Sequence, residues 1–190
     1  MAKLFFRYSS MNAGKSTSLL QIAYNYEEHG QQVLLFTARI DNRSGVGRIA
    51  SRLGLSRQAE TFDTTTDFWT LLQARKELAC VLIDEAQFLT PTQVVQLHRL
   101  ANVANLPVIC FGIRSDFQGS AFPGAAQLLT LADDIEEIKT ICACGRKATM
   151  QVRLDDAGQR VLEGAQIQIG GNGRYQQVCA RCFYQGDSSA

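Results

Sequence analysis

Apolar and polar residues alternate along the chain with two different periods as far as about residue 139. Short apolar runs, rich in β-branched and aromatic residues, are separated by longer segments with the spacing of amphipathic helices. The predicted strands are residues 4–8, 32–37, 59–62, 80–84, 107–113 and 135–139. The predicted helices are residues 15–29, 66–78, 91–104 and 124–131. Helices alternating with nearly continuous apolar strands predict an α/β fold, in which helices cover both faces of a mostly parallel sheet.

Two of the predicted helices carry clear end signals. Thr90 is placed as an N-cap, Pro91 follows at the first helical position, and Gln93 can complete a capping box. Gly30 follows the first predicted helix and can adopt the left-handed conformation that often closes a helix. Thr90, Pro91 and Gln93 predict where the helix at residues 91–104 begins. Gly30 predicts where the helix at residues 15–29 ends.

The pattern changes after about residue 139, and no helix is predicted beyond this point. Short alternating runs are separated by loops rich in Asp, Asn and Gly, which indicates a small β-rich domain. The runs are residues 149–154, 159–162 and 166–169. The predicted divisions of the chain are a first domain at residues 1–139, a second at 140–184, and a disordered tail at 185–190.

Composition narrows the class of protein. The 190 residues are 46% hydrophobic and 19% charged, which is usual for a globular protein with a core. The formal net charge of +1 gives no basic excess, and this argues against a nucleic-acid-binding surface. The apolar run at residues 4–6 is too short for a signal peptide, and no later run is long enough to cross a bilayer. We expect a cytoplasmic protein that binds neither nucleic acid nor membranes.

An eight-residue motif lies between the first predicted strand and the first predicted helix. It matches G-x-x-x-x-G-K-[ST] except at its first position and consists of Ser9, Ser10, Met11, Asn12, Ala13, Gly14, Lys15 and Ser16. Such a P-loop binds phosphates through backbone N–H groups at a helix N-terminus. We predict that Lys15 reaches the β- and γ-phosphates of ATP, that Gly14 permits a close backbone approach, and that the Ser16 hydroxyl binds Mg²⁺. Serine at position 9 predicts ordinary backbone angles there. The alternative is a chance Gly-Lys-Ser turn.

A second motif supports the first. The apolar strand predicted at residues 80–84 ends in Asp84, and Glu85 follows it. A carboxylate at this end of a neighbouring strand is where P-loop proteins hold Mg²⁺, usually through water. Glu85 could activate water, as in an ATPase, or accept the proton of a substrate hydroxyl, as in a kinase. Position alone does not separate these two roles. The alternative for Asp84 is an ordinary turn residue at a strand end.

The six cysteines are unevenly placed. Cys80 and Cys110 stand alone in apolar runs and are expected to be buried. The other four form two close pairs near the C-terminus and are Cys142, Cys144, Cys179 and Cys182. Two such pairs can form a closed tetrahedral Zn²⁺ site, although the C-x-C half is less usual than C-x₂-C. An iron–sulfur cluster and plain buried thiols remain alternatives. Structural zinc would stabilise a small domain that has few large apolar residues.

Four segments occur in a distinctive order along the chain. They are Y-S-S-M-N-A-G-K-S-T at residues 8–17, D-E-A-Q-F-L at 84–89, C-A-C-G-R-K-A at 142–148 and I-G-G-N-G-R-Y at 169–175. In these segments the chain resembles the type II, zinc-containing thymidine kinases, especially their bacterial branch, over nearly its whole length. The resemblance implies a P-loop (RecA-like) α/β fold with a small zinc-binding domain. It also implies transfer of the ATP γ-phosphoryl group to the thymidine 5′-hydroxyl (EC 2.7.1.21), a reaction of nucleotide salvage for DNA synthesis.

The resemblance further implies roles for individual residues. Glu85 would be the general base that accepts the proton of the thymidine 5′-hydroxyl. Residues 150–175 resemble the family's lasso loop, which closes over the base, reads its edge mainly with backbone groups and is braced by Tyr175. Asp41 and Arg43 would approach the phosphates and the metal. The expected thymidine-binding residues are Met11, Phe88, Phe117, Phe122, Gly170 and Tyr175.

Oligomeric state and regulation also follow from the resemblance, which implies a homotetramer inhibited by the end product dTTP. The chain departs from the family pattern at two positions. Ser9 replaces the leading glycine of the loop, as is familiar in the bacterial branch. Cys182 stands where some bacterial relatives use histidine, and either residue can bind zinc. For Gln151 and Gln166 the resemblance implies no individual contacts.

Three functional hypotheses follow from the sequence. The first is a thymidine kinase with Mg²⁺·ATP as the phosphoryl donor and a structural Zn²⁺. The second is a P-loop ATPase in which Glu85 activates water, so that ATP turnover needs no nucleoside. The third is a zinc-ribbon protein that binds nucleic acid, which the near-neutral charge disfavours.

Overall fold

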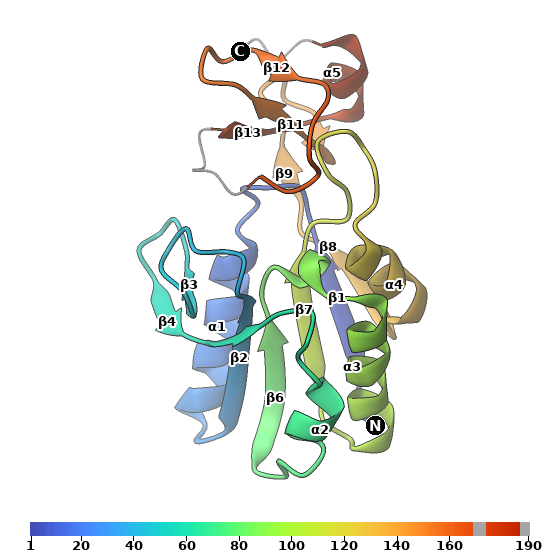
Figure 1. Ribbon diagram of the computed structural model, residues 1–190. Coiled ribbons are helices and arrows are strands. Elements are labelled where there is room, and N and C mark those ends of the chain that lie inside the picture. Colours follow the sequence, from blue (N-terminus) through green and yellow to red (C-terminus); the bar gives the residue numbers. More distant parts are fainter. Residues whose placement is uncertain (169–173, 187–190) are drawn as a thin grey trace.

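The computed structural model describes residues 1–168 and 174–186. Residues 1–139, called the P-loop domain below, contain a six-stranded sheet with its helices (Figure 1). Residues 140–186, called the C-terminal module, lie beyond one end of this sheet. Among the described residues, no helix has the length and apolar character needed to cross a membrane.

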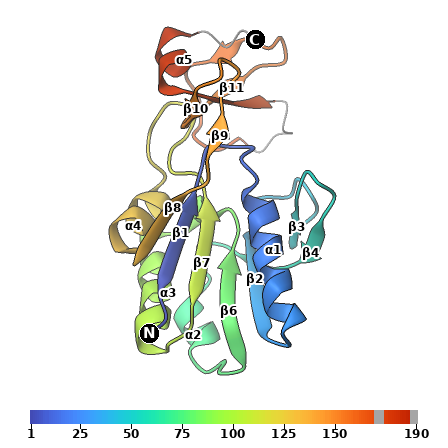
Figure 2. The same ribbon diagram turned by 180° about the vertical axis from the view of Figure 1, so that it is seen from behind.

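All neighbouring strands of the large sheet are parallel, as predicted. In spatial order they are β5 (Glu60–Phe62), β2 (Gln32–Ala38), β6 (Leu78–Ile83), β7 (Val108–Gly112), β1 (Leu4–Tyr8) and β8 (Asp134–Glu137). Because the strands are parallel, their carboxyl ends meet at one edge, the edge that faces the C-terminal module in Figures 1 and 2. The P-loop follows β1 and Asp84 follows β6 at this edge.

Helices cover both faces of the sheet. Helix α1 (Lys15–Glu28) packs on one face, where Leu19 and Ala23 meet Leu82 and Phe111. Helices α2 (Phe68–Leu72), α3 (Pro91–Val103) and α4 (Pro123–Leu131) contribute to the apolar cluster on the other face. Successive side chains of a strand point to opposite faces, so a strand covered on both sides must be apolar throughout. This requirement explains the continuous apolar runs in the sequence.

The predicted helix ends are confirmed. The Thr90 side chain accepts a hydrogen bond from the Gln93 N–H, and the Gln93 side chain accepts one from the Thr90 N–H, so the capping box is complete. Pro91 is the first residue of α3. Gly30 has a φ of 70°, in the left-handed region, directly after the C-cap of α1. The prediction that Cys80 and Cys110 are buried is also confirmed.

The helix predicted at residues 66–78 is much shorter than expected. Helix α2 contains only Phe68–Leu72, capped by Asp67, whose side chain accepts a hydrogen bond from the Thr70 N–H. Phe68 and Leu72 are buried, but none of residues 73–77 is buried. Without an apolar face to bury, the chain turns and enters β6 at Leu78, which pairs with Gln32. Tertiary pairing therefore overrides helix propensity here.

A hairpin between β2 and β5 was not predicted. Strands β3 (Arg48–Ala50) and β4 (Ser56–Gln58) pair antiparallel, and only Ile49 reaches the core. One buried residue gives no detectable periodicity, so the sequence pattern showed only a polar stretch.

The C-terminal module is rich in strands, as expected, but it also contains a helix that was not predicted. Its strands are β9 (Thr140–Ile141), β10 (Lys147–Ala148), β11 (Met150–Leu154), β12 (Arg160–Val161) and β13 (Tyr175–Val178). Helix α5 (Ala180–Gln185) starts at Cys179, whose Sγ accepts a hydrogen bond from the Cys182 N–H. Gln185, the first residue of the predicted disordered tail, is therefore helical. Residues 166–168 form no strand, and residues 169–173 and 187–190 lie outside the described residues.

Candidate active site

The P-loop holds its lysine in a defined position. Lys15 is buried, and its Nζ donates hydrogen bonds to Ser9 Oγ at 3.1 Å and to the Ser10 carbonyl at 2.9 Å. Lys15 is also the first residue of α1, so its charge and the positive end of the helix lie together. This arrangement concentrates positive potential where a phosphate would bind. Ser9 and Ser10 serve as anchors for Lys15 and do not line the adjoining cavity.

Backbone geometry explains two residues of the loop. Gly14 has a φ of 86°, which side chains other than glycine adopt at a cost. A Cβ built on Gly14 would meet no atom within 4 Å, so within this chain the left-handed backbone is what calls for glycine. Asn12, a residue type that tolerates this region, has a φ of 64°. Ser9 lies outside the left-handed region. This agrees with the prediction that a serine in place of the leading glycine has ordinary backbone angles.

The two predicted magnesium ligands touch each other. Ser16 Oγ, at the start of α1, donates a hydrogen bond of 2.8 Å to Asp84 Oδ2, at the end of β6. The other oxygen of Asp84 accepts the N–H of Glu85 at 3.0 Å. Hydroxyl and carboxylate oxygens are the donors that Mg²⁺ prefers, and both side chains line the cavity. The donor set therefore fits this cation.

Burial changes the acidity of the charged groups at this edge. Burial, and then the charge of Glu85, raise the pKa of Asp84 to about 7. Burial lowers the pKa of Lys15 from its ordinary value, an effect that the negative charges of Glu85 and Asp84 oppose. Each group is thus in an environment that disfavours its own charge. A cation and a phosphate would supply the compensating charges.

Glu85 has an unusual backbone and two partners. Its φ is 54°, in the left-handed region, where it precedes the short helix η1 (Ala86–Phe88). Arg43 Nη2 donates to Glu85 Oε1 at 2.7 Å, and Gln87 Nε2 donates to Glu85 Oε2 at 2.5 Å. Arg43 also pairs with Asp41, and hydrogen bonds to Asp41 raise the pKa of Arg43 above its ordinary value. Asp41 and Arg43, expected on the phosphate side, therefore lie directly beside the expected base.

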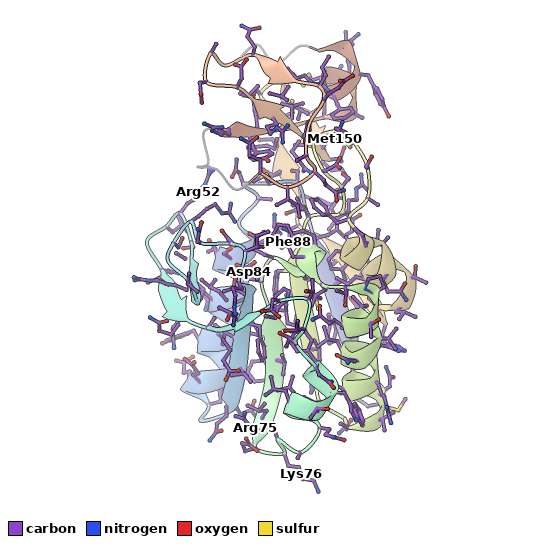
Figure 3. The ribbon with its side chains drawn as sticks, in the orientation of Figure 1. Arg52, Arg75, Lys76, Asp84, Phe88 and Met150 are labelled. Carbon is purple, nitrogen blue, oxygen red and sulfur yellow. The ribbon has the colours of Figure 1, made fainter. Side chains whose placement is uncertain are left out.

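One cavity of about 860 Å³ joins these groups to an aromatic wall. Its polar end contains Lys15, Ser16, Asp84 and Glu85. Its apolar end includes the predicted nucleoside-binding residues Met11, Phe88, Phe117, Phe122 and Tyr175. Phe88 and Phe122 meet edge to face, with ring centroids 5.9 Å apart. Gly170 lies outside the described residues. In Figure 3, Asp84 and Phe88 lie at the edge of the sheet next to the C-terminal module, whereas Arg75 and Lys76 lie at the opposite end.

Side chains of the C-terminal module close one side of this cavity. Gln151, which is 2% exposed, donates to the Ser115 carbonyl, and Gln166 Nε2 donates to Asp116 Oδ2 at 2.9 Å. The Tyr175 hydroxyl donates to the Gln168 carbonyl at 3.1 Å, so it braces the segment that precedes residues 169–173. Gln151, Gln166 and Gln168 all line the cavity. Their contribution was not predicted, because a single glutamine, in a strand such as β11 or in a loop, carries no distinguishing pattern.

The unpredicted hairpin also borders the cavity. Arg48, Ile49, Ala50, Ser51, Arg52 and Leu53 line it beside the P-loop. Arg52 donates a hydrogen bond of 2.5 Å to Asn12 Oδ1, and Asn12 in turn donates to Gln177 Oε1 of the C-terminal module at 3.1 Å. Figure 3 shows Arg52 on the hairpin beside the P-loop end of the sheet. The cluster of arginines in a polar stretch was the available sequence signal, but it is equally typical of a solvated surface.

The four paired cysteines come together in the C-terminal module. The Sγ atoms of Cys142, Cys144, Cys179 and Cys182 all lie within 4.8 Å of one another, and those of Cys144 and Cys179 are 3.6 Å apart. A tetrahedral zinc site with Zn–S bonds of about 2.3 Å places its sulfur atoms about 3.8 Å apart. A hydrogen bond from the Arg146 N–H, with contributions from the other thiols, lowers the pKa of Cys144 to about 6. The cluster fits a structural zinc ion.

The fold and the site together define a class. A lysine and a serine at a helix N-terminus, beside an acidic strand end, make this a P-loop protein built to bind a nucleotide triphosphate. The aromatic side chains in the same cavity are suited to a second, planar ligand.

Comparisons with known proteins give the particular family. A sequence model described as thymidine kinase matches residues 2–183. A thymidine kinase from Chromobacterium violaceum is 62% identical over 184 residues, which cover 97% of this chain and 99% of that protein. One from Agrobacterium fabrum is 55% identical over 184 residues, 95% of each chain. The chain belongs to the thymidine kinase family.

A comparison of structures found a crystal structure of Pif1 helicase from Candida albicans, with a TM-score of 0.45 and 12% identity. The match covers 74% of this chain and 36% of the helicase.

Proposed function

We propose that this protein transfers the γ-phosphoryl group of ATP to the 5′-hydroxyl of thymidine, giving dTMP and ADP. The observation that carries the proposal is that Glu85 lines the same cavity as the phosphate-binding loop and the aromatic side chains of Phe88, Phe117 and Phe122. Membership of the thymidine kinase family supports it and disfavours both a plain ATPase and a nucleic-acid-binding protein. Phosphoryl transfer needs mainly positioning and charge neutralisation, which such a cavity supplies.

The phosphate side of the reaction belongs to the P-loop. The backbone of residues 9–16 and the Lys15 amine bind the β- and γ-phosphates. Ser16 and Asp84 would hold Mg²⁺, directly or through water, and the ion would supply neutralisation of the charge that develops on the phosphates. Arg43, fixed by Asp41 and Glu85, presents a permanent positive charge to the same region. This charge can stabilise the transferring group.

The nucleoside side is bounded by Met11, Phe88, Phe117 and Phe122, which accept the thymine ring. Tyr175 lines the same cavity, and Gly170, which the resemblance also assigns to thymidine binding, lies outside the described residues. Glu85 then accepts the proton of the 5′-hydroxyl as that oxygen attacks the γ-phosphorus. The faces of the aromatic side chains are suited to a flat base. Polar groups that line the cavity fix the orientation of that base.

Further parts of the proposal concern the whole protein. The four cysteines hold a structural Zn²⁺, the chain acts as a homotetramer in the cytoplasm, and dTTP inhibits it. Mass measurement in solution, metal analysis and inhibition by added dTTP test these points one by one.

One assay separates the kinase from the ATPase. ADP release from Mg²⁺·ATP is measured with and without thymidine. A kinase requires thymidine for turnover, because its hydroxyl is the acceptor. Equal rates in both conditions contradict the kinase proposal and favour activation of water by Glu85.

The base is tested by Glu85→Gln. This variant keeps the shape and the hydrogen bond from Arg43 but cannot accept a proton in the same way. We expect kcat to fall about 10²–10⁴-fold, the range typical of a general base, with little change in ATP binding. A near-normal kcat would remove Glu85 from the mechanism.

A further inference from the structure

Both carboxylate oxygens of Glu85 have a donor, and the two donors differ. Oε1 receives Arg43 Nη2, a charged group on a side chain that is 29% exposed. Oε2 receives Gln87 Nε2, a neutral group on a residue that is 3% exposed. Glu85 itself is 16% exposed in its side chain. The carboxylate is therefore fixed at two points, one at the surface and one in the interior.

The Gln87 amide is itself held in place. Its Oε1 accepts a hydrogen bond from the Ile113 N–H at 3.3 Å, just beyond the end of β7. Gly112, the last residue of β7, has no side chain, and a Cβ there would lie 2.8 Å from Gln87 Oε1. The amide thus occupies space that only glycine at position 112 leaves free. With its oxygen bound to the backbone, its nitrogen must point toward Glu85.

We propose that Gln87 is a positioning residue that holds the Glu85 carboxylate in the orientation needed to accept the proton of the substrate hydroxyl. The proposal rests on the function proposed above for Glu85. A glutamate side chain has three rotatable bonds, and the left-handed backbone of Glu85 does not fix them. A hydrogen bond from an immobile amide restricts the carboxylate without adding charge. Small misplacements of a catalytic group are costly to the rate.

The two partners of Glu85 also differ in how they are held. Arg43 belongs to a loop after β2, and its guanidinium is shared between Asp41 and Glu85. Gln87 belongs to η1, which is packed between the sheet and α4. Gln87 therefore provides the fixed reference for the carboxylate.

The first variant is Gln87→Met, which keeps the approximate volume and removes the donor. We expect kcat to fall about 10–100-fold, the effect of one lost hydrogen bond to a charged group. KM for thymidine and for ATP should change little, because methionine keeps the approximate volume of this cavity-lining side chain. The matched control is Gln93→Met, which alters another buried glutamine whose amide donates to the backbone carbonyls of Asp63 and Thr66 rather than to Glu85. It should lower the melting temperature and leave kcat unchanged.

The decisive measurement repeats Gln87→Met in the Glu85→Gln background. If Gln87 acts through Glu85, the second substitution should lower kcat further by less than about threefold, since interacting groups are not additive. An equal fold-loss in both backgrounds would show a purely structural role and overturn the proposal. So would an unchanged kcat in Gln87→Met alone. A near-normal kcat in Glu85→Gln alone is a different result, because it rejects the base itself.

A second perturbation guards against a variant that does not fold. Gly112→Ala leaves the chemistry of Gln87 intact but crowds its amide oxygen, at 2.8 Å from the added Cβ, and its backbone nitrogen, at 3.1 Å. We expect the same pattern, with a lower kcat in the native background and little further loss beside Glu85→Gln. Losses that multiply in the double variant would contradict the role of Gln87.

Discussion

In the P-loop domain, apolar side chains from both faces of a six-stranded sheet are buried in two clusters. In the C-terminal module there is one small cluster of six buried residues, and two of them, Cys142 and Cys179, belong to the cysteine group. The first region can keep its shape through burial of apolar surface alone. The second has little apolar surface, so we expect it to depend on the metal that its cysteines fit. Because the cavity lies between the two regions, its two ends should respond differently to damage.

Removal of the metal is the strongest test of this difference. Structural zinc contributes about 10–16 kcal/mol in zinc-finger peptides, more than the whole stability of many domains. In Cys142→Ser we expect loss of zinc, unfolding of the C-terminal module and loss of thymidine binding. The P-loop domain should keep its fold and its phosphate binding. Metal analysis, hydrogen exchange and separate titrations with thymidine and ATP measure these effects.

A variant that kept its zinc would refute the metal site. Loss of protection from hydrogen exchange in β1 and β6 would show that the P-loop domain also depends on zinc, and the contrast between the two regions would then fail.

The converse test damages the core of the P-loop domain. Leu97 of α3 is fully buried, so Leu97→Ala should lower the free energy of unfolding by about 2–5 kcal/mol. Zinc content at a temperature below the transition should not change. Val95 is 48% exposed on the same helix, and Val95→Ala should cost no more than about 0.5 kcal/mol. Urea unfolding followed by circular dichroism measures both. Equal losses would mean that burial does not stabilise this region.

The same contrast explains what the sequence could predict. Strands such as β1 and β6 are recognisable because burial on both faces requires continuous apolar residues, and the P-loop is recognisable because its chemistry requires Lys15 and Ser16 after a strand. The β3–β4 hairpin has a single core residue, Ile49, and α5 begins at Cys179, with no long apolar face. Neither has a periodic pattern. Predictions from pattern therefore succeed where burial determines structure.

Contacts between residues that are far apart in the sequence could not be predicted, for another reason. The pairing of Arg43 with Glu85 joins a loop after β2 to the end of β6. Gln87 reaches Glu85 only because Gly112, on a third strand, leaves space. Such contacts depend on the packed position of neighbouring strands, which no local pattern specifies. The sequence predicts which groups meet ATP and thymidine, and the structure adds the residues that hold those groups.

Asp84→Asn tests how much stability the protein loses by burying the ionised carboxylate of Asp84. Its pKa is about 7 in the folded protein and about 3.9 in an unfolded chain, so the folded state binds this proton more tightly. The stability of the native protein should therefore decrease as the pH rises between these values. Asparagine cannot ionise. Without nucleotide and added Mg²⁺, the variant should gain stability relative to the native protein from about pH 5 to about pH 8, although its activity is lost.

Urea midpoints of both proteins at the two pH values measure this effect. The same difference at both values would show that Asp84 is not strained by burial. A difference in stability between the two proteins that grows toward low pH would contradict the prediction, because the cost of the ionised carboxylate must grow toward high pH.

The smallest effect concerns an ion pair that joins the two regions. Lys147 in β10 lies 2.5 Å from Glu137 in β8, and the two side chains are 49% and 19% exposed. Exposed ion pairs contribute at most about 1 kcal/mol and are screened by salt. Lys147→Ala should therefore lower stability by no more than this, and by less in about 1 M salt. Thymidine affinity should not change, because the C-terminal module meets the cavity through the amides of Gln151 and Gln166, which the substitution leaves intact. Thermal unfolding at two salt concentrations and a thymidine titration measure both quantities. A larger loss that persists in high salt would mean that surface charge, rather than the amide contacts, holds the module against the P-loop domain.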